Sequence, residues 1–282
     1  NKNVADRILE GMGKERFTTI RVNKLKYNIN DLKEYLTNNN IMYDSVEWYE
    51  DALVLKNVKE KELEKLDIYK NGQIYIQSLS SMIPALVLKP EENDKVLDLT
   101  AAPGSKTTQM ANMMNNKGYI LANEIDKIRC ERLRYNVKLQ NAGIVKVENE
   151  DGRNIGEKYK EYFDKVLLDT PCSGEGRFLL KNPKTYNSWS KDEVKKLSNL
   201  QKELIKSGIT ALKSGGTMCY STCTLNKTEN EDIIKWVKDN FDVELIDIDL
   251  KIKNSITVIK KALKILPSVM HEGFFVAKLH KK

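Results

Sequence analysis

The chain has 282 residues, of which 40% are hydrophobic and 31% charged, so it can bury a sizeable core beneath a well-solvated surface. Its formal net charge of +7 permits binding to a polyanion without requiring it. Since no apolar stretch is long enough to span a bilayer and no signal-peptide pattern opens the chain, we expect a cytoplasmic protein with no membrane partner.

A polar, proline-containing break at Lys89–Asp94 predicts two units, residues 1–90 and 91–282. Before the break the predicted elements are short and of mixed type, which indicates a small α+β domain. The predicted strands are Phe17–Val22, Ile41–Trp48, Ala52–Leu55 and Gln73–Ile76. The predicted helices are Asn30–Leu36, capped by Asn30, and Lys59–Leu66.

After the break, strands and helices alternate regularly. The predicted strands are Val96–Leu99, Tyr119–Glu124, Val145–Asn149, Lys165–Leu168, Gly216–Ser221, Val243–Ile248 and Phe274–Leu279. The predicted helices are Thr107–Asn115, Lys127–Asn141, Lys191–Leu212 and Glu229–Asn240. This alternation indicates an α/β fold with a mostly parallel sheet and helices on both faces. Ligands of such sheets bind at the carboxyl ends of the strands.

A loop of small residues follows the first strand of this second unit. It consists of Thr100, Ala101, Ala102, Pro103, Gly104, Ser105 and Lys106, and it leads into a helix whose N-terminus and backbone amides can approach a ligand. The spacing matches neither a Walker phosphate loop nor a dinucleotide-binding glycine motif.

Acidic residues follow the next two strands, at Glu124 and Asp151. An acid in such a place can bind ribose hydroxyls, although each one taken singly is equally typical of an exposed strand end. Together with the small-residue loop, the two acids favour an adenosine-type cofactor without a phosphate. S-adenosyl-L-methionine is the best candidate.

Two of the four cysteines lie in distinct motifs at strand ends, Cys172 within Asp169–Gly174 and Cys223 within Tyr220–Thr224. Thiols at the ends of adjacent strands face one pocket, where one can attack a substrate while the other helps it leave. By position alone they are equally consistent with inert core thiols, which is our expectation for Cys130 and Cys219. The cysteine spacings fit no zinc pattern and histidine is nearly absent, so no metal site is expected.

The segments Asp98–Thr107, Asp169–Gly174 and Tyr220–Thr224, with Glu229–Glu231, resemble the Nop/Sun family of RNA (cytosine-5)-methyltransferases. The resemblance extends to Ile20–Asn23, Gln77–Met82, Lys181–Pro183 and His271–Lys278, and so covers nearly the whole chain. It implies a class I Rossmann-like methyltransferase fold, S-adenosyl-L-methionine as cofactor and RNA as substrate. The unit at 1–90 would then be an RNA-binding accessory domain, beside a catalytic domain at 91–282.

The resemblance also implies roles for individual residues. Cys223 would attack carbon 6 of cytosine, and Cys172 would assist loss of the carbon 5 proton and release of the enzyme. Asp169 would hydrogen-bond the base and lie near the methionine end of the cofactor, with Lys106 beside both. Residues Thr100 to Lys106 would line the cofactor; Glu124, assisted by Arg129, would bind the ribose, and Asp151 the adenine side. Thr100 departs from the many relatives that carry cysteine there.

Several alternatives stay open. DNA cytosine-5 methyltransferases attack with the cysteine of a Pro-Cys motif, which here would be Cys172, but the intact motif around Cys223 favours Cys223. The chain is expected to be a monomeric enzyme acting on tRNA or rRNA, with a slight preference for tRNA because it is compact. The rivals are a non-catalytic RNA-binding assembly factor and a DNA methyltransferase. Arg21 and the Lys181–Pro183 loop are the expected RNA contacts.

Overall fold

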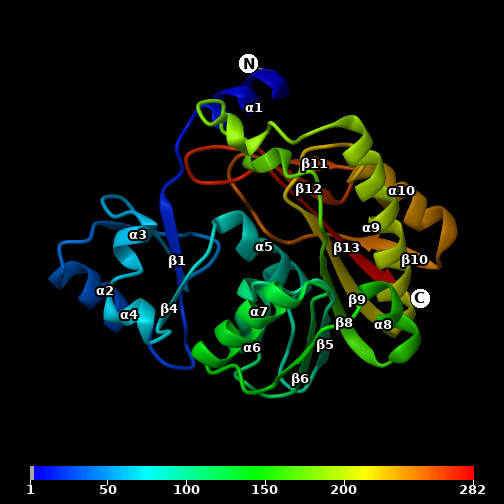
Figure 1. Cartoon of the computed structure of the whole chain (residues 1–282), viewed down its shortest axis with the longest axis horizontal. Helices are drawn as coiled ribbons and strands as arrows, with labels where there is room; N and C mark the ends of the chain where they lie inside the picture. The colour runs from blue at the N-terminus through cyan, green and yellow to red at the C-terminus, as the bar shows by residue number, and fades with distance from the viewer. Residues whose placement is uncertain (1–2) are drawn as a thin grey trace.

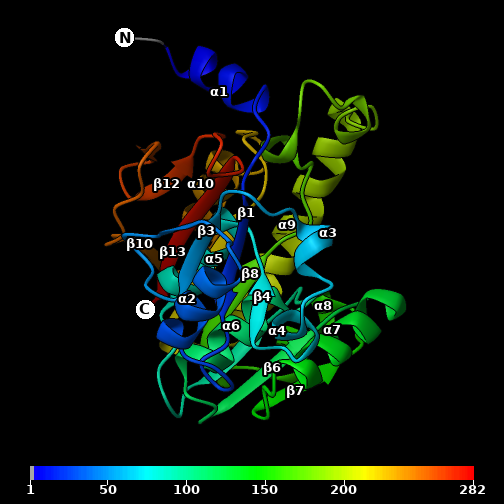
Figure 2. The same ribbon diagram turned by 90° about the vertical axis from the view of Figure 1, so that its left-hand side faces the viewer.

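The computed structural model describes residues 3–282 and arranges them around two sheets of different size. Figure 1 shows the four-stranded sheet and its helices, which we call the small unit, beside a nine-stranded sheet with helices on both faces. In the turned view of Figure 2 the small unit lies in front of the larger sheet. Within residues 3–282, no helix is long and apolar enough to cross a membrane.

The small unit is an antiparallel sheet in the order β2-β3-β1-β4. Its strands are β1 (Thr18–Val22), β2 (Tyr43–Ser45), β3 (Ala52–Leu55) and β4 (Ile74–Ile76). The helices of this part of the chain are α1 (Val4–Met12), α2 (Ile29–Asn38), α3 (Glu60–Leu63) and α4 (Asp67–Lys70). Ile20 and Leu53 from the sheet pack against Leu32 and Leu36 of α2, which places the apolar stripe of that helix on the sheet.

Two predictions about helix ends in the small unit are wrong. Helix α2 is capped by Asn28 rather than Asn30, because the Asn28 side chain accepts a hydrogen bond from the Asp31 amide at 2.8 Å. The single helix expected at Lys59–Leu66 is the short α3, followed by α4, because Leu66 takes an extended backbone conformation between them.

The larger sheet runs in the order β11-β12-β13-β9-β8-β5-β6-β7, with β10 paired to β13. Its parallel strands are β5 (Lys95–Asp98), β6 (Tyr119–Asn123), β7 (Val145–Glu148), β8 (Phe163–Asp169) and β9 (Leu212–Thr222). The antiparallel strands are β10 (Val243–Ile246), β11 (Ser255–Val258), β12 (Ala262–Ile265) and β13 (Phe274–Lys281). The hairpin β11–β12 was not predicted.

Helices cover both faces of this sheet. They are α5 (Leu79–Leu88), α6 (Ser105–Met113), α7 (Lys127–Leu139), α8 (Gly152–Lys158), α9 (Lys191–Ala211) and α10 (Glu231–Asn240). Neighbouring residues of one strand enter different cores: Leu167 packs with residues of α5 and α6, whereas Leu168 packs with residues of α8, α9 and α10. The predicted α/β architecture, with a mostly parallel sheet covered on both faces, is therefore confirmed.

Helix α5 connects the two units and was not predicted. It is apolar on nearly all sides because it is buried between them: Leu79 and Met82 pack with Val54 of the small unit, and Ile83 packs with the core of the larger sheet. A helix buried all round lacks the amphipathic period that identifies surface helices. The division at residue 90 stays a proposal, and residues 1–2 of its first unit lie outside the described residues.

Candidate active site

A cavity of about 1000 Å³ lies at the carboxyl ends of β5, β6 and β8, where the small unit faces the larger sheet. Its lining includes Lys106, Glu124 and Asp151, together with Cys172 and Cys223. The sequence placed these residues at strand ends, and the parallel sheet brings those ends to one edge.

The loop after β5 begins at Thr100, whose hydroxyl donates to the Asp169 carbonyl at 2.9 Å. Gly104 has φ +104° and precedes α6; a Cβ atom there would lie 2.9 Å from Leu133 Cδ1. Behind the loop, Thr107 donates to buried Asp98 at 2.6 Å and fastens the first turn of α6 to β5. Burial raises the pKa of Asp98 to about 7.

The two acids that follow β6 and β7 both line the cavity. Glu124 is only 3% exposed; it accepts from the Asp126 amide at 3.0 Å and lies 3.5 Å from an Arg129 guanidinium nitrogen. Asp151 caps α8 and pairs with Arg153 at 2.6 Å, and the hydrogen bonds from Arg153 lower the pKa of Asp151. Carboxylates placed in this way can accept hydrogen bonds from hydroxyl or amino groups of a ligand, which fits a nucleoside cofactor.

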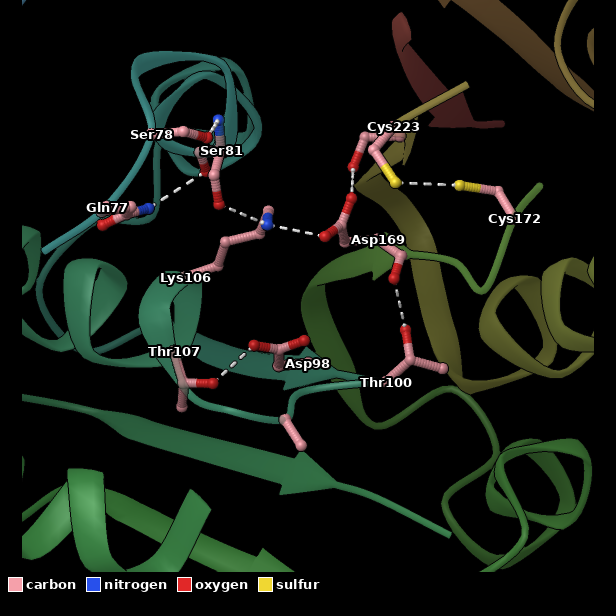
Figure 3. Close-up of polar contacts among 12 residues, drawn as sticks. Gln77, Ser78, Ser81, Asp98, Thr100, Lys106, Thr107, Asp169, Cys172 and Cys223 are labelled. Atoms are coloured by element: carbon pink, nitrogen blue, oxygen red, sulfur yellow. Dashed lines mark hydrogen bonds and ion pairs between the residues drawn. The ribbon is translucent and has the colours of Figure 1, made fainter. Parts of the chain in front are cut away.

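Lys106 and Asp169 form an ion pair between the loop and the cysteines (Figure 3), with 2.6 Å between Lys106 Nζ and Asp169 Oδ2. Lys106 also donates to Ser81 Oγ of α5 at 2.8 Å. The other carboxylate oxygen of Asp169 accepts from the Ser221 hydroxyl at 2.7 Å. Asp169 is thus oriented from two sides while it faces the cavity. The contribution of Ser81 was missed, although it lies in one of the recognised motifs.

The sulfur atoms of Cys172 and Cys223 lie 3.2 Å apart (Figure 3). Cys223 follows β9 and Cys172 follows β8, and the two strands are parallel neighbours. The expectation that these thiols share a pocket is therefore confirmed.

The two cysteines differ in protonation. A hydrogen bond from the Cys172 thiol lowers the pKa of Cys223, assisted by the positive charge of Arg177. The same hydrogen bond, together with burial, raises the pKa of Cys172 well above its ordinary value. The arrangement therefore favours ionisation of Cys223 over ionisation of Cys172.

The loop that carries Cys172 is held by Glu229, which is fully buried. Ser173 donates its amide to Glu229 Oε1 at 3.0 Å and its hydroxyl to Glu229 Oε2. Gln201 of α9 donates to the same carboxylate at 2.9 Å, and Tyr220 donates to the Glu229 carbonyl at 2.6 Å. Burial raises the pKa of Glu229 despite these donors. Sequence reasoning recognised the motif at Glu229 but not this contact.

Gly176 connects the Cys172 loop to two further segments. Its amide donates to the Cys223 carbonyl at 2.9 Å, and its carbonyl accepts from the Gly273 amide at 2.8 Å. A Cβ atom at Gly176 would lie 1.8 Å from the Gly273 carbonyl oxygen, so this approach requires glycine. Three segments distant in sequence thus meet beside Cys223.

The expected RNA contact at Arg21 is wrong. Arg21 is fully buried and donates to Gln77 and Thr108, both at 3.2 Å, so it fastens the small unit to α6. Its sequence motif therefore reflects packing between the units rather than contact with a ligand. The Lys181–Pro183 loop is exposed and stays a predicted RNA contact.

The other two cysteines do not line the cavity. Cys130 and Cys219 are buried, as expected of core thiols, and burial raises the pKa of both. Among residues 3–282, no cluster of three or more histidine, cysteine, aspartate or glutamate side chains is arranged to hold a metal ion.

Comparisons with known proteins agree on one family. The sequence model of the family described as 16S rRNA methyltransferase RsmB/F matches residues 85–280. A ribosomal RNA small subunit methyltransferase F from Shewanella sp. (strain MR-4) is 39% identical over 270 residues, which cover 93% of this chain and 56% of that protein. The protein of the same name from Escherichia coli O139:H28 (strain E24377A / ETEC) is 38% identical over 272 residues, which cover 93% and 57%. The chain thus spans little more than half the length of these relatives.

A solved structure, that of a methyltransferase homologue from Pyrococcus horikoshii, has the same fold. The TM-score is 0.87 at 34% identity, over 99% of this chain and 90% of that one. The expected Rossmann-like sheet of class I methyltransferases is therefore confirmed.

Proposed function

Because the chain belongs to the RsmB/F family of 16S rRNA methyltransferases, we propose that it transfers a methyl group from S-adenosyl-L-methionine to carbon 5 of a cytosine in small-subunit rRNA. The observation that carries this proposal is the pair of sulfur atoms 3.2 Å apart, in which the hydrogen bond from Cys172 lowers the pKa of Cys223. The printed names of the relatives favour rRNA over tRNA. The preference for tRNA was based on the compactness of the chain. That basis is weak, because the chain matches only part of the length of those relatives.

The cofactor is assigned to the strand-end groups, which fit a nucleoside without phosphates. Glu124 and Asp151 offer carboxylate oxygens to its polar groups. Beside them the cavity wall consists of small side chains, those of Thr100, Ala101, Ala102, Pro103 and Ser105. Arg129 assists Glu124 from 3.5 Å. When bound, S-adenosyl-L-methionine supplies an electrophilic methyl group.

The residues at the other end of the cavity activate the base. The Cys223 thiolate forms a bond to carbon 6, and the electron pair displaced from the ring makes carbon 5 nucleophilic. Asp169 accepts a hydrogen bond from the protonated ring nitrogen 3, and Lys106 and Ser221 hold it in place for this task. The base has to be unpaired or flipped to reach these groups.

Cys172 serves the second half of the reaction. While Cys223 is a thiolate, the hydrogen bond between the sulfur atoms keeps Cys172 protonated. Once Cys223 is bonded to carbon, that cause of the raised pKa disappears, and Cys172 can lose its proton to solvent. It then takes the proton from carbon 5, and the electron pair of that bond expels Cys223 as a thiolate.

The experiment is transfer of radiolabelled methyl groups to deproteinised 16S rRNA, 30S subunits, tRNA and DNA. We expect incorporation into 16S rRNA or 30S subunits that RNase removes. Incorporation only into tRNA or DNA would contradict the proposed substrate. Cofactor binding without transfer to any of them would favour the non-catalytic assembly factor.

The two cysteine variants test the division of roles. Cys223→Ala should abolish both methylation and covalent capture of RNA, whereas Cys172→Ala should accumulate an RNA–protein adduct that resists denaturation. Denaturing gels with labelled RNA distinguish the two. The reverse pattern would assign the attack to Cys172.

A further inference from the structure

Arg177 carries a charge at the active site for which the protein offers no direct partner. Across residues 3–282, its guanidinium makes no hydrogen bond or ion pair within the usual distances. Its neighbour Glu175, by contrast, accepts from Asn226 at 2.8 Å and from Trp189 at 3.0 Å. The charge of Arg177 therefore acts on the groups of the cavity only over longer distances.

The backbone and the side chain both place Arg177 at the cysteines. The preceding residue, Gly176, donates its amide to the Cys223 carbonyl. Arg177 is therefore the residue next to that hydrogen bond. The side chain folds back over the loop, since a Cβ atom built on Gly174 would lie 3.4 Å from a terminal guanidinium nitrogen of Arg177. Arg177, Cys172 and Cys223 line the same cavity.

The charges around this position come from several elements. Asp169 at the end of β8 is paired with Lys106 of α6. Glu272, before β13, accepts from the Ser78 hydroxyl at 3.2 Å. Arg16, ahead of β1, donates to the Gly176 carbonyl at 3.1 Å, and its charge lies near both Glu272 and Arg177.

Of these charges, the negative ones oppose ionisation of Cys223. Asp169 and Glu272 both raise the pKa of Cys223, whereas the guanidinium of Arg177 lowers it. The effect is reciprocal, because the charge on Cys223 is the largest cause that raises the pKa of Arg177. No hydrogen bond to Cys223 is needed for this effect, since two opposite charges in a common cavity attract over several ångströms.

We propose that Arg177 is a positioning residue that holds Cys223 in its thiolate form before RNA arrives, in addition to the hydrogen bond from Cys172. Its importance for catalysis rests on the proposed function, but the state of Cys223 can be measured without RNA. The influence of the Arg177 charge on Cys223 is moderate, because solvent screens this exposed side chain.

The test is the pH dependence of alkylation of Cys223 by iodoacetamide in the purified full chain, since only the thiolate reacts. Trypsin releases Cys223 in the peptide Ser214–Lys227, and fragment ions separate it from buried Cys219, which serves as an internal reference for folding. Arg177→Met removes the charge and Arg177→Lys keeps it. Arg132→Met removes an equal charge from the exposed face of α7 and is the matched control.

We expect Arg177→Met to move the alkylation midpoint upward by about 0.5 to 1 pH unit, and to slow alkylation about 3- to 10-fold below the midpoint. Arg177→Lys should bring the midpoint most of the way back to that of the unaltered chain, and Arg132→Met should leave the midpoint in place.

An unchanged midpoint in Arg177→Met overturns the proposal. If the KM for RNA rises at the same time, Arg177 contacts a phosphate instead. Failure to methylate any RNA would refute the proposed function while leaving this ionisation result interpretable.

Discussion

The cavity has two halves, and the contacts that hold the side chains of one half differ in kind from those of the other. We define the cofactor half as the Thr100–Ser105 loop with Glu124 and Asp151. Its two carboxylates each follow a strand and have a partner close by in sequence: Glu124 is near Arg129, and Asp151 pairs with Arg153. The Thr100 hydroxyl is the exception, because it donates to the distant Asp169 carbonyl. Local structure therefore places these two carboxylates.

The cysteine half consists of the Cys172–Arg177 loop, Cys223 and Gly273. Its contacts join distant parts of the chain, as in the hydrogen bond between Ser173 and Glu229, which are 56 positions apart. Gly176 bonds to both Cys223 and Gly273. Each contact in this half therefore supports the others.

This difference predicts how the two halves respond to substitution. Groups that are placed independently should show additive effects, whereas groups in one network should be strongly coupled. A change in the cofactor half should alter one contact to the ligand. A change in the cysteine half should disturb both sulfur atoms, even when the substituted residue contacts neither of them.

The largest expected effect follows from Glu229→Gln. The glutamine oxygen can still accept from the Ser173 amide and from Gln201, but its NH2 group replaces the oxygen that accepts from the Ser173 hydroxyl, so that buried donation is lost. At about 1 to 3 kcal/mol for each buried group left without a partner, we expect methyl transfer to fall about 100-fold. Steady-state assays and calorimetric measurement of cofactor binding separate the loss of transfer from any change in cofactor affinity.

The control for this variant is Glu157→Gln, which removes a charge from an exposed position of α8. We expect it to leave methyl transfer and cofactor affinity unchanged. If Glu229→Gln weakened cofactor binding as strongly as it slowed transfer, the two halves would not be independent and the comparison would be wrong.

The same contrast explains what the sequence could predict. The loop at Thr100 and the acid Glu124 were identified because each directly follows a predicted strand. The order of β8 and β9 likewise predicted that Cys172 and Cys223 meet. The contact of Glu229 with Ser173 was not predictable, because it depends on where the start of α10 lies relative to a loop far away in sequence.

Burial accounts for two further failures of prediction. Arg21 was expected to contact RNA because it is basic and lies in one of the motifs that carry the resemblance. The structure buries it because the small unit covers α6, and Gln77 and Thr108 supply acceptors there. Helix α5 escaped notice for the same reason, since it is buried between both units.

A smaller effect is expected for Asp151→Asn in the cofactor half. The substitution keeps the shape but removes the charge that Arg153 balances and weakens the proposed contact to the adenine side. We expect the cofactor Kd to rise about 10-fold, which corresponds to about 1.4 kcal/mol. The rate of Cys223 alkylation should stay unchanged if the halves are independent.

Glu203→Gln is the matched control, because Glu203 is the other carboxylate paired with Arg153, at 3.2 Å, and does not line the cavity. It should leave the cofactor Kd near that of the unaltered chain. An equal loss of affinity in both variants would mean that Arg153, rather than Asp151, determines binding.

The smallest expected effect is a loss of folding stability at acidic pH, caused by His271 in the segment that also carries Gly273. His271 is buried beside Trp48, and among residues 3–282 its Nε2 has no hydrogen-bond partner. Burial lowers the pKa of His271 from 6.5 to about 4. Between these values the unfolded chain binds a proton that the folded chain lacks, so folding stability is lost as the pH falls.

This loss should amount to about 1 kcal/mol between pH 6.5 and 5.5. His271→Phe removes the titrating group while keeping an aromatic ring against Trp48, so urea unfolding should show a flatter dependence on pH in this window. His280→Asn should keep the slope of the unaltered chain.

Because His271 is two residues from Gly273, the sharper measurement is Cys223 alkylation across the same window. If acid released the Gly273 segment without changing that reaction beyond its ordinary thiolate dependence, the contacts of the cysteine half would not act together.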